Sequence, residues 1–345
     1  MPEIEYVEDR MESEELLERL CPPVRNWFKD KFPDFTEPQK VAIPRILNGE
    51  HLLLCSPTGS GKTLTAFLTI IDDLVRRSLD GSLPDAVQCV YISPIKALAN
   101  DIEKNLLGPL GEIKERYLPS RAKEIKVGLR TGDTPQSERE KMLRKPPHIL
   151  ITTPESMGLG LASKRFRPIL DQMKWFIIDE MHSLVPTKRG THLSLSMALM
   201  DSVVSSDVQR IGISATMEPL DAVAEFLVAS DSRESDIDPQ KVAIAKISGD
   251  RELDLDIILP TPRFSSIPVK EILDHNVDRI KELAEAHTTT LVFVNTRNMT
   301  ETVVQRLKIA GMEGVEGHHG SMDKAIRLDV ESKLKNGLLR CVVSS

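Results

Sequence analysis

Residues 51–68 read HLLLCSPTGSGKTLTAFL and combine an apolar run, a glycine-rich centre and the start of a helical pattern. The apolar run predicts a buried strand. The segment TLTAFLTIIDDLVRR (63–77) has the spacing of an amphipathic helix. A strand, a glycine-rich loop and a helix in this order are the setting that a phosphate-binding loop requires.

The residues of the loop have the chemistry that phosphate binding needs. Gly59 and Gly61 allow backbone N–H groups to curl around a phosphate, and the next helix adds its dipole. Lys62 can reach the β and γ phosphates of a nucleotide, and the Thr63 hydroxyl can bind Mg²⁺. The strict pattern has a glycine where this chain has Ser56. The alternative is a glycine turn with an incidental lysine, and the flanking strand and helix argue against it.

Short apolar runs alternate with helical patterns from residue 50 onward. The runs that we predict as strands are HLLLCSP, QCVYISP, KVGLRTG, HILITTP, WFIIDEM and QRIGISAT. Between them lie helical stretches such as THLSLSMALMDSVVS, whose apolar face carries Leu193, Met197, Met200 and Val204. This alternation predicts an α/β fold with a parallel sheet covered on both faces. Each run ends in polar or turn residues, which is where open parallel sheets bind ligands.

A second strand–helix alternation follows a polar segment. ASDSRESDIDPQ (229–240) is typical of an exposed loop, and TTTLVFVNT, ETVVQRLKIAG and DKAIRLDVESKLKNG then resume the pattern. We predict a boundary near residue 248, with residues 1–247 and 248–345 as two domains. The final LLRCVVSS (338–345) has the pattern of a buried strand that reaches its polar end.

Two acids follow the apolar run WFII in WFIIDEMH (175–182). We expect Asp179 and Glu180 to point in different directions, because side chains alternate along a strand. Asp179 suits a place near Mg²⁺, and Glu180 can polarise an attacking water. An acid pair at a strand end is often only a solvated loop, but a phosphate-binding loop in the same sheet favours phosphoryl transfer to water.

Composition excludes several classes of protein. The 345 residues hold no apolar run long enough for a membrane span, and the N-terminus is acidic rather than a secretory signal. Four scattered cysteines predict reduced thiols in a cytoplasmic protein rather than a disulfide framework or a zinc site. Of the net charge of −7, residues 1–30 contribute −5, from nine acids and four bases, so the remaining −2 allows a local basic groove.

Several motifs in the same order resemble superfamily 2 DExH-box helicases, and within them the large helicase-related family. The segments are FTEPQKVAIPRILNGEHLLLCSPTGSGKTLTAFL, YISPIKALANDI, RTGDTPQSEREKMLRKPPHILITTPESM, DEMHSLVPTKRGTHLSLS, QRIGISAT and HHGS. The resemblance runs from about residue 30 to the end and implies two tandem RecA-like domains, the second incomplete. It also implies an ATP-dependent helicase that uses Mg²⁺, tracks single-stranded DNA in the 3′→5′ sense and serves DNA repair or replication-fork maintenance.

The resemblance assigns roles at the nucleotide. Gln39 would read the adenine edge, which a side-chain amide can do with two hydrogen bonds. His182 would contact a motif formed by Ser214 and Thr216 that couples nucleotide state to domain movement. The catalytic residues would be Lys62, Asp179 and Glu180, with Mg²⁺ held by Thr63 and Asp179. The remaining ATP-binding residues would be Thr58, Gly59, Ser60 and Gly61.

The resemblance also places nucleic-acid contacts on loops of both domains. Such loops offer backbone N–H groups, hydroxyls and basic side chains to phosphates, and these contacts carry no sequence information. The residues are Pro94, Lys96, Arg130, Thr131, Gly132, Thr153 and Pro154 in the first domain, and Asn295, Thr296, Arg297, His319 and Gly320 in the second. Single-stranded DNA, a DNA/RNA hybrid and RNA all remain open as the bound strand, and no protein partner is indicated.

Three alternatives remain at this stage. The adjacent His318 and His319 could bind metal, although no cysteine or carboxylate stands at ligand spacing. A small-molecule kinase could use the same loop, but it leaves the other motifs unexplained. The chain could also bind nucleotide and nucleic acid without catalysis, because the family's arginines that reach the γ-phosphate would follow the strand at 338–345 and no such segment is present.

Overall fold

The chain forms two compact units, Met1–Arg251 and Glu252–Ser345. The computed structural model describes residues 2–94, 102–205, 207–215, 217–228, 241–247, 254–259 and 269–345. The predicted boundary near residue 248 lies outside the described residues. Each unit is a parallel sheet with helices, so the predicted α/β fold class is confirmed.

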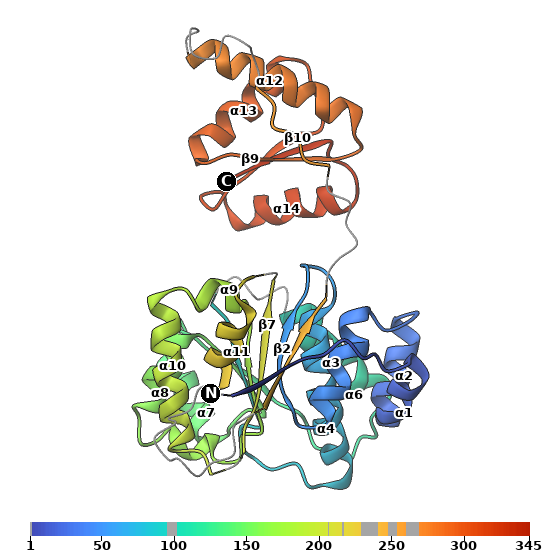
Figure 1. Ribbon diagram of the computed structural model, residues 1–345, viewed down its shortest axis with the longest axis vertical. Helices are drawn as coiled ribbons and strands as arrows, with labels where there is room; N and C mark the ends of the chain where they lie inside the picture. The colour runs from blue at the N-terminus through green and yellow to red at the C-terminus, as the bar shows by residue number, and fades with distance from the viewer. Residues whose placement is uncertain are drawn as a thin grey trace. The chain divides into compact units, whose positions relative to one another are not determined.

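The first unit is built on an eight-stranded parallel sheet in the order β1-β8-β2-β7-β6-β3-β5-β4 (Figure 1). Its strands are β1 (Glu3–Tyr6), β2 (His51–Cys55), β3 (Cys89–Ile92), β4 (Val127–Arg130), β5 (Ile149–Thr152), β6 (Trp175–Ile178), β7 (Gln209–Ser214) and β8 (Lys241–Lys246). The six strands predicted from apolar runs are all present. Because every neighbouring pair is parallel, the carboxyl ends of all eight strands lie along one edge.

Helices cover both faces of this sheet (Figure 1). One face carries α1 (Ser13–Arg19), α2 (Pro22–Lys31), α3 (Glu37–Leu47), α4 (Lys62–Asp80), the π-helix η1 (Glu103–Leu107) and α6 (Gly108–Arg116). The other carries α8 (Pro154–Leu161), the 3₁₀ helix η2 (Arg167–Leu170), α9 (Met181–Leu184), α10 (Lys188–Asp201) and α11 (Leu220–Val228). The helix α7 (Gln136–Arg144) buries none of its residues.

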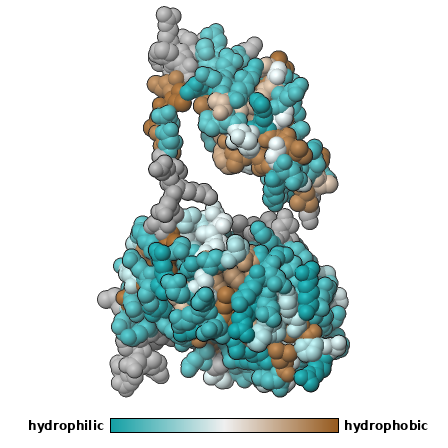
Figure 2. All heavy atoms as spheres, turned by 90° about the vertical axis from the view of Figure 1, so that its right-hand side faces the viewer, coloured by the Kyte–Doolittle hydropathy of each residue, from teal (hydrophilic) through white to brown (hydrophobic). Residues whose placement is uncertain are grey.

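Alternation along the central strands supplies both cores. In β2, Leu52 and Leu54 pack into the core under α3 and α4, whereas Leu53 packs into the core under α10 and α11. This is why apolar runs without polar gaps predict a sheet that is buried on both sides. The face that carries α1 and α2 is mostly hydrophilic on its outside (Figure 2). In α1, whose sequence is SEELLER, only Leu16 is buried and the charged side chains face outward. Across the described ranges, the helices are too short or too polar to cross a bilayer.

Two details of the first unit differ from the prediction. The strand predicted in WFIIDEM consists of the four apolar residues alone and ends at Ile178, so Asp179 and Glu180 lie in the connection to α9 and strand alternation does not set their directions. The apolar face predicted to include Val204 ends earlier, because α10 stops at Asp201 and Val204 is half-buried beyond it. Leu193, Met197 and Met200 are buried as predicted.

The second unit has a three-stranded parallel sheet in the order β10-β11-β9. Its strands are β9 (Thr290–Phe293), β10 (Val315–His318) and β11 (Cys341–Ser344), and its helices are α12 (Val269–Ala286), α13 (Arg297–Ile309) and α14 (Lys324–Lys335). The strand predicted in LLRCVVSS is β11, in which Cys341, Val342 and Val343 are buried. It lies between the other two strands and joins them through backbone hydrogen bonds.

The start of α10 lies against the backbone of the preceding turn. The Thr187 hydroxyl caps the helix by accepting the N–H of Gly190 at 3.4 Å. A Cβ at Gly190 would lie 2.4 Å from the carbonyl oxygen of Leu184 and 2.9 Å from that of Val185. Backbone oxygens cannot swing aside as side-chain ends can, so this close approach requires glycine.

We therefore expect Gly190→Ala to lower the free energy of unfolding by about 1–3 kcal/mol, as overpacking does in other cores. Urea denaturation of the purified chain measures this loss. The control is Gly111→Ala in α6, where no atom lies within 4 Å of the added Cβ. Alanine is the better helix former, so this variant should be as stable as the native chain or slightly more so. Equal stability of Gly190→Ala and the native chain would show that the turn can move.

Candidate nucleotide and nucleic-acid site

The loop between β2 and α4 has the backbone conformation that a phosphate-binding loop needs. Gly59 and Gly61 have φ values of 81° and 90°, in the left-handed region that favours glycine. The helix α4 begins at Lys62 and runs for 19 residues, so its N-terminal N–H groups point into the loop. The Ser60 hydroxyl donates to the Pro57 carbonyl at 2.8 Å and lies 2.7 Å from the hydroxyl of Ser56. Position 56, where the strict pattern has glycine, is therefore a serine whose hydroxyl takes part in the hydrogen bonds of the loop.

Lys62 is held inside the curl of this loop. Its ammonium donates to the carbonyls of Ser56 and Pro57, the second at 2.8 Å, and the residue is 9% exposed. Burial lowers the pKa of Lys62, while the nearby carboxylates of Glu180 and Asp179 oppose that shift. A phosphate that enters the loop offers this ammonium an anionic partner in place of two neutral carbonyls.

The segment before α3 packs against the loop. Thr36 and Gln39 form a capping box, in which the Thr36 N–H donates to the Gln39 side-chain oxygen at 2.9 Å. The Thr36 hydroxyl donates to the Ser60 carbonyl at 3.0 Å, and the Gln39 amide nitrogen would lie 3.3 Å from a Cβ at Gly61. Gln39 is therefore buried next to the phosphate-binding loop. Its contact with adenine stays a prediction.

Asp179 lies at the end of β6 with both carboxylate oxygens engaged. One oxygen accepts the N–H of Glu180 at 2.9 Å, and the other accepts the hydroxyl of Tyr91 from the neighbouring strand β3. The ring of Tyr91 packs against Phe67 of α4, with ring centroids 4.8 Å apart. Sequence reasoning missed Tyr91. A phenol within the otherwise apolar QCVYISP was the available signal, because a buried tyrosine hydroxyl needs a partner.

Glu180, His182 and the end of β7 form one hydrogen-bonded group. Glu180 has φ 52°, the only positive value at a non-glycine among the described residues. The N–H of Ala215 donates to His182 Nδ1 at 3.3 Å, and His182 Nε2 lies 3.1 Å from the Glu180 carboxylate. Because Nδ1 accepts a hydrogen bond, Nε2 carries the proton and donates to Glu180. Ser214 Oγ lies 3.5 Å from the same Nδ1, whereas Thr216 lies outside the described residues.

These groups can hold Mg²⁺ by their chemistry. Thr63 supplies a hydroxyl on the first turn of α4, and Asp179 supplies a carboxylate, the oxygen ligands that Mg²⁺ prefers together with phosphate oxygens and water. Within the described ranges no cluster of three or more His, Cys, Asp or Glu side chains is arranged as a protein-only metal site. His318 and His319 instead face Glu331 and Glu301, at 3.3 and 2.8 Å.

The predicted nucleic-acid loops of the first unit follow β3, β4 and β5, at the same edge as the nucleotide loop. The Arg130 guanidinium lies over the ring of Phe166, 4.8 Å from its centroid. Burial is the main cause that lowers the pKa of Arg130, and the charge of Arg139 is the second. Arg139 itself donates to the carbonyls of Thr131 and Gly132, at 2.9 and 3.0 Å. The two like charges make this a place where an anion is favourable. The structure shows Arg139 as a support that sequence reasoning missed.

The loop after β5 has a local cap, and the loop after β3 is described only as far as Pro94. Thr153 caps α8 by accepting the Ser156 N–H at 3.3 Å, and Pro154 is the first residue of that helix. Pro94 is buried, and Lys96 lies outside the described residues.

In the second unit, Asn295–Arg297 lies close to Gly320, so the two groups of residues predicted to contact nucleic acid are neighbours. Thr296 caps α13 by accepting the Met299 N–H at 3.2 Å, which places Asn295 before the helix and Arg297 at its start. An open hollow of about 620 Å³ is lined by Asn295, Thr296, Arg297, Asn298, Gly320 and Ser345. Residues 25 positions apart in the sequence therefore share one surface. His319 lies nearby in the chain and is 7% exposed.

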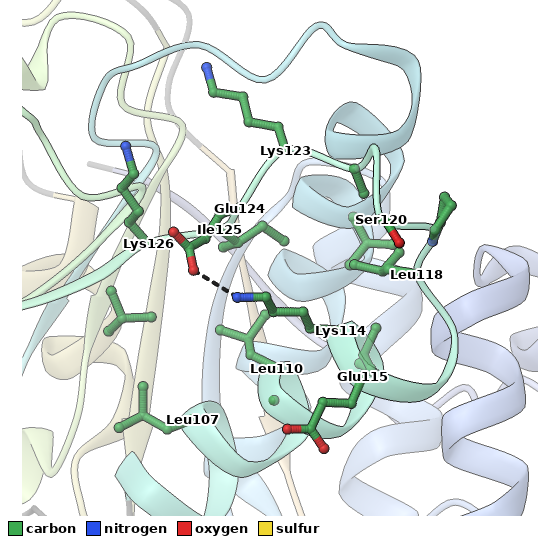
Figure 3. A pocket seen from close by; sticks show the side chains of 16 residues that line it. Leu107, Leu110, Lys114, Glu115, Leu118, Ser120, Lys123, Glu124, Ile125 and Lys126 are labelled. Atoms are coloured by element: carbon green, nitrogen blue, oxygen red, sulfur yellow. Dashed lines mark hydrogen bonds and ion pairs between the residues drawn. The ribbon is translucent and has the colours of Figure 1, made fainter.

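A cavity of about 600 Å³ lies away from these residues (Figure 3). It is lined by α6 and by the segment that leads into β4, with Leu107, Leu110 and Leu118 among its apolar residues. Lys114 reaches Glu124 at 2.8 Å within it. Because this segment precedes β4, the cavity belongs to the amino-terminal edge of the parallel sheet, opposite the phosphate-binding loop.

Comparison with known proteins identifies the family. The family model described as DEAD/DEAH box helicase matches residues 36–224. This chain belongs to the DEAD/DEAH box helicases. The match covers more than half of the chain and spans the loops and strand ends described above.

Among helicase relatives, the chain is similar to ATP-dependent helicase Lhr-Core of Methanocaldococcus jannaschii, with 44% identity over 100% of this chain and 40% of the relative. Lhr-Core of Methanothermobacter thermautotrophicus is 47% identical over 94% of this chain and 38% of the relative. The solved structure of Mycobacterium smegmatis helicase Lhr bound to ssDNA and AMP-PNP has a TM-score of 0.73 and 38% identity, and covers 95% of this chain and 42% of that chain. The chain thus spans about two fifths of the length of these helicases.

We expect Tyr91→Phe to weaken Mg²⁺ binding about tenfold, because a supporting hydrogen bond orients a metal-binding carboxylate. Phenylalanine keeps the ring that packs on Phe67 and removes only the hydroxyl that Asp179 accepts. Titration of Mg²⁺ into the chain with a fluorescent ATP analogue gives the metal affinity directly. The control is Tyr117→Phe, which removes a hydroxyl bonded to the exposed Asp30. An unchanged Mg²⁺ affinity in Tyr91→Phe would show that Asp179 needs no such support.

Proposed function

We propose that this chain is the ATP-hydrolysing core of a helicase of the Lhr-Core kind. It binds ATP and Mg²⁺ on the first unit and tracks a single strand of DNA in the 3′→5′ sense. One observation carries the proposal: His182 joins Glu180 to Ala215, so the proposed water-activating residue is bonded to the end of a different strand. A loop that only bound phosphate would not need this link.

The phosphates of ATP would enter the loop at residues 56–63. Its N–H groups and the N-terminus of α4 supply positive potential, and Lys62 exchanges its carbonyl partners for phosphate oxygens. Thr63 and Asp179 would hold Mg²⁺, which neutralises charge on the β and γ phosphates when bound. Tyr91 and the Glu180 N–H keep the Asp179 carboxylate in one orientation.

Glu180 would take a proton from the water that attacks the γ-phosphorus. The new P–O bond forms as the bond between the γ-phosphorus and the bridging oxygen breaks, and ADP leaves with that electron pair. His182 donates to one carboxylate oxygen through Nε2–H, which leaves the other oxygen free to face the water. Because His182 also accepts from Ala215, a movement of the residues after β7 would alter the position of the base.

In the first unit, the nucleic-acid strand would contact the loops at the carboxyl ends of β3, β4 and β5. In the second unit, it would contact the hollow at Asn295–Arg297. Backbone contacts of this type do not distinguish bases, so a DNA/RNA hybrid or RNA also fits. Single-stranded DNA is favoured because the Mycobacterium smegmatis relative is named as bound to ssDNA. We also propose a cytoplasmic location and a role in DNA repair, in keeping with the motifs shared with this helicase family.

The test of the whole proposal is ATP hydrolysis by the 345-residue chain, with and without single-stranded DNA. We expect hydrolysis that DNA stimulates. Binding of both ligands without turnover would leave a binding module rather than an enzyme, and turnover that ignores DNA would remove the nucleic-acid part of the proposal.

We expect Lys62→Ala to weaken ATP binding by at least 100-fold, because a charge-assisted contact to two phosphates is lost. Fluorescence titration with an ATP analogue measures the dissociation constant. The control is Lys174→Ala, since Lys174 immediately precedes β6 and lies at the opposite edge of the same sheet. Native affinity in Lys62→Ala would reject the phosphate-binding loop.

We expect Glu180→Gln to bind ATP with native affinity and to lose hydrolysis by a factor of about 10² to 10⁴, the usual contribution of a general base. The amide keeps the size of the side chain and can still accept from His182. Single-turnover hydrolysis with prebound ATP separates chemistry from binding. Full activity of this variant would exclude Glu180 as the base.

A further inference from the structure

Arg189 connects two of the predicted nucleic-acid loops. Its guanidinium donates to both oxygens of Glu155, from Nε at 2.6 Å and from Nη2 at 3.1 Å. Its remaining nitrogen, Nη1, donates to the carbonyl of Pro94 at 2.9 Å. Glu155 follows Pro154 at the start of α8, and Pro94 follows β3. One side chain thus joins the end of β3, the start of α8 and the start of α10.

The ion pair lies at the surface, with 41% of the Arg189 side chain and 51% of the Glu155 side chain exposed, but it is more constrained than a single contact. An exposed lysine–carboxylate pair contributes little because each side chain can move freely. Here the guanidinium is planar, makes a fork with the carboxylate and is fixed by a third bond to a buried residue. The bonds from Arg189 are the main reason that the pKa of Glu155 falls to about 2. Both groups are therefore charged throughout the neutral range.

The position of Arg189 in its helix supports the same conclusion. It is the second residue of α10, where a positive side chain is unfavourable because the helix dipole is positive there. Glu155 lies in the first turn of α8, where a negative side chain is favourable. The cation is stabilised at α10 because it reaches across to that carboxylate. This placement makes sense if joining the segments matters more than local helix stability.

The neighbouring glycine fixes the other end of the connection. Gly190 packs on the carbonyls of Leu184 and Val185, at the end of the short helix that starts directly after Glu180. Arg189 therefore extends from backbone that is closely packed against the end of the helix carrying His182. The loops and the proposed catalytic residues are linked through this contact.

We propose that Arg189 is a positioning residue that holds Pro94, at the end of β3, and the start of α8 in register for a nucleic-acid strand, without touching that strand. The inference rests on the proposed function, because the loops were assigned to nucleic acid there. Loops held in the bound arrangement bind more tightly, since less ordering is needed when the strand arrives. Arg189 should thus raise affinity for single strands while leaving ATP affinity unchanged.

Three variants and a control separate positioning from direct contact. Arg189→Gln removes the charge and the fork, Arg189→Lys keeps the charge but not the fork, and Glu155→Gln removes the anionic partner. Lys188→Gln is the matched control, because it removes an exposed positive charge from the adjacent position of the same helix. Thermal unfolding of each variant checks that the fold is intact.

The first readout is amide hydrogen exchange without any nucleic acid. The Ser93 N–H donates to Thr152 at 3.0 Å, and the Ser156 N–H donates to Thr153 Oγ1 at 3.3 Å, so these amides report on the two loops. We expect exchange at both to be several-fold faster in Arg189→Gln and native in Lys188→Gln. Native exchange in Arg189→Gln would overturn the inference, whatever the chain binds.

The second readout is the affinity for a labelled oligothymidylate across a range of salt concentrations. We expect the dissociation constant to rise about tenfold in Arg189→Gln, equivalent to about 1.4 kcal/mol, with an unchanged salt slope. Arg189→Lys should recover little of this loss. A double variant that combines Arg189→Gln with Glu155→Gln, made in addition to the single substitutions, should lose little more than Arg189→Gln alone, because the two act as one pair.

Each other outcome has a distinct meaning. A salt slope reduced by about 0.7, with full recovery by lysine, would show that Arg189 touches a phosphate itself and would overturn positioning. A fluorescent ATP analogue that binds Arg189→Gln more weakly would point to general damage and count against the inference. If the native chain binds no oligonucleotide, the proposed function fails, while hydrogen exchange still decides whether Arg189 holds the loops.

Discussion

The parallel pairing of β2, β7, β6 and β3 is the constraint on which the first unit depends. The register sets Cys55 opposite Ser214, Ile178 opposite Gly212, and Ile92 opposite Ile178. The chain therefore leaves the sheet at nearly the same level in four strands. Antiparallel pairing would send alternate connections to opposite edges and separate the motifs. The predicted phosphate-binding loop, the acidic pair and the histidine contact are neighbours because of this register.

Burial at that edge is tolerable because polar groups are supplied with partners by the backbone and by neighbouring strands. Lys62 has carbonyls, Asp179 has an N–H and a phenol, and His182 has an N–H from the end of β7. A charge that lacked such partners would shift its pKa until it became neutral. The site can therefore keep charged groups close together where Lys62 and Asp179 are buried, and burial strengthens their interactions with a nucleotide.

Much of the fold could be predicted from sequence because central strands of a parallel sheet are apolar on both faces. Five of the six runs between His51 and Thr216 were visible for that reason, and the exception is KVGLRTG, which forms the edge strand β4. The edge strand β1 was not visible, since three of its four residues, Glu3, Glu5 and Tyr6, are polar or aromatic and the burial there is slight. The strand β8 was missed because its alanines in KVAIAK weaken the apolar signal next to a charged segment.

The candidate site shows a similar division. Motif spacing pointed to Lys62, Asp179, Glu180 and His182, whose chemistry is carried by residue type. It could not reveal Tyr91 or Arg189, because their contacts join segments 88 and 34 residues away along the chain. The direction of Glu180 was also out of reach. Its left-handed backbone is a property of the turn after β6 and has no signature in the residues themselves.

That left-handed backbone sets stability against activity at one position. A side chain with a Cβ is less stable there by about 1–2 kcal/mol, whereas glycine has no such penalty. Shortening residue 180 to glycine would relax the turn and at the same time delete the proposed base. Selection for thermostability alone would therefore favour glycine at position 180 and give an inactive protein. A stabilised variant of this chain should be engineered with Glu180 kept unchanged.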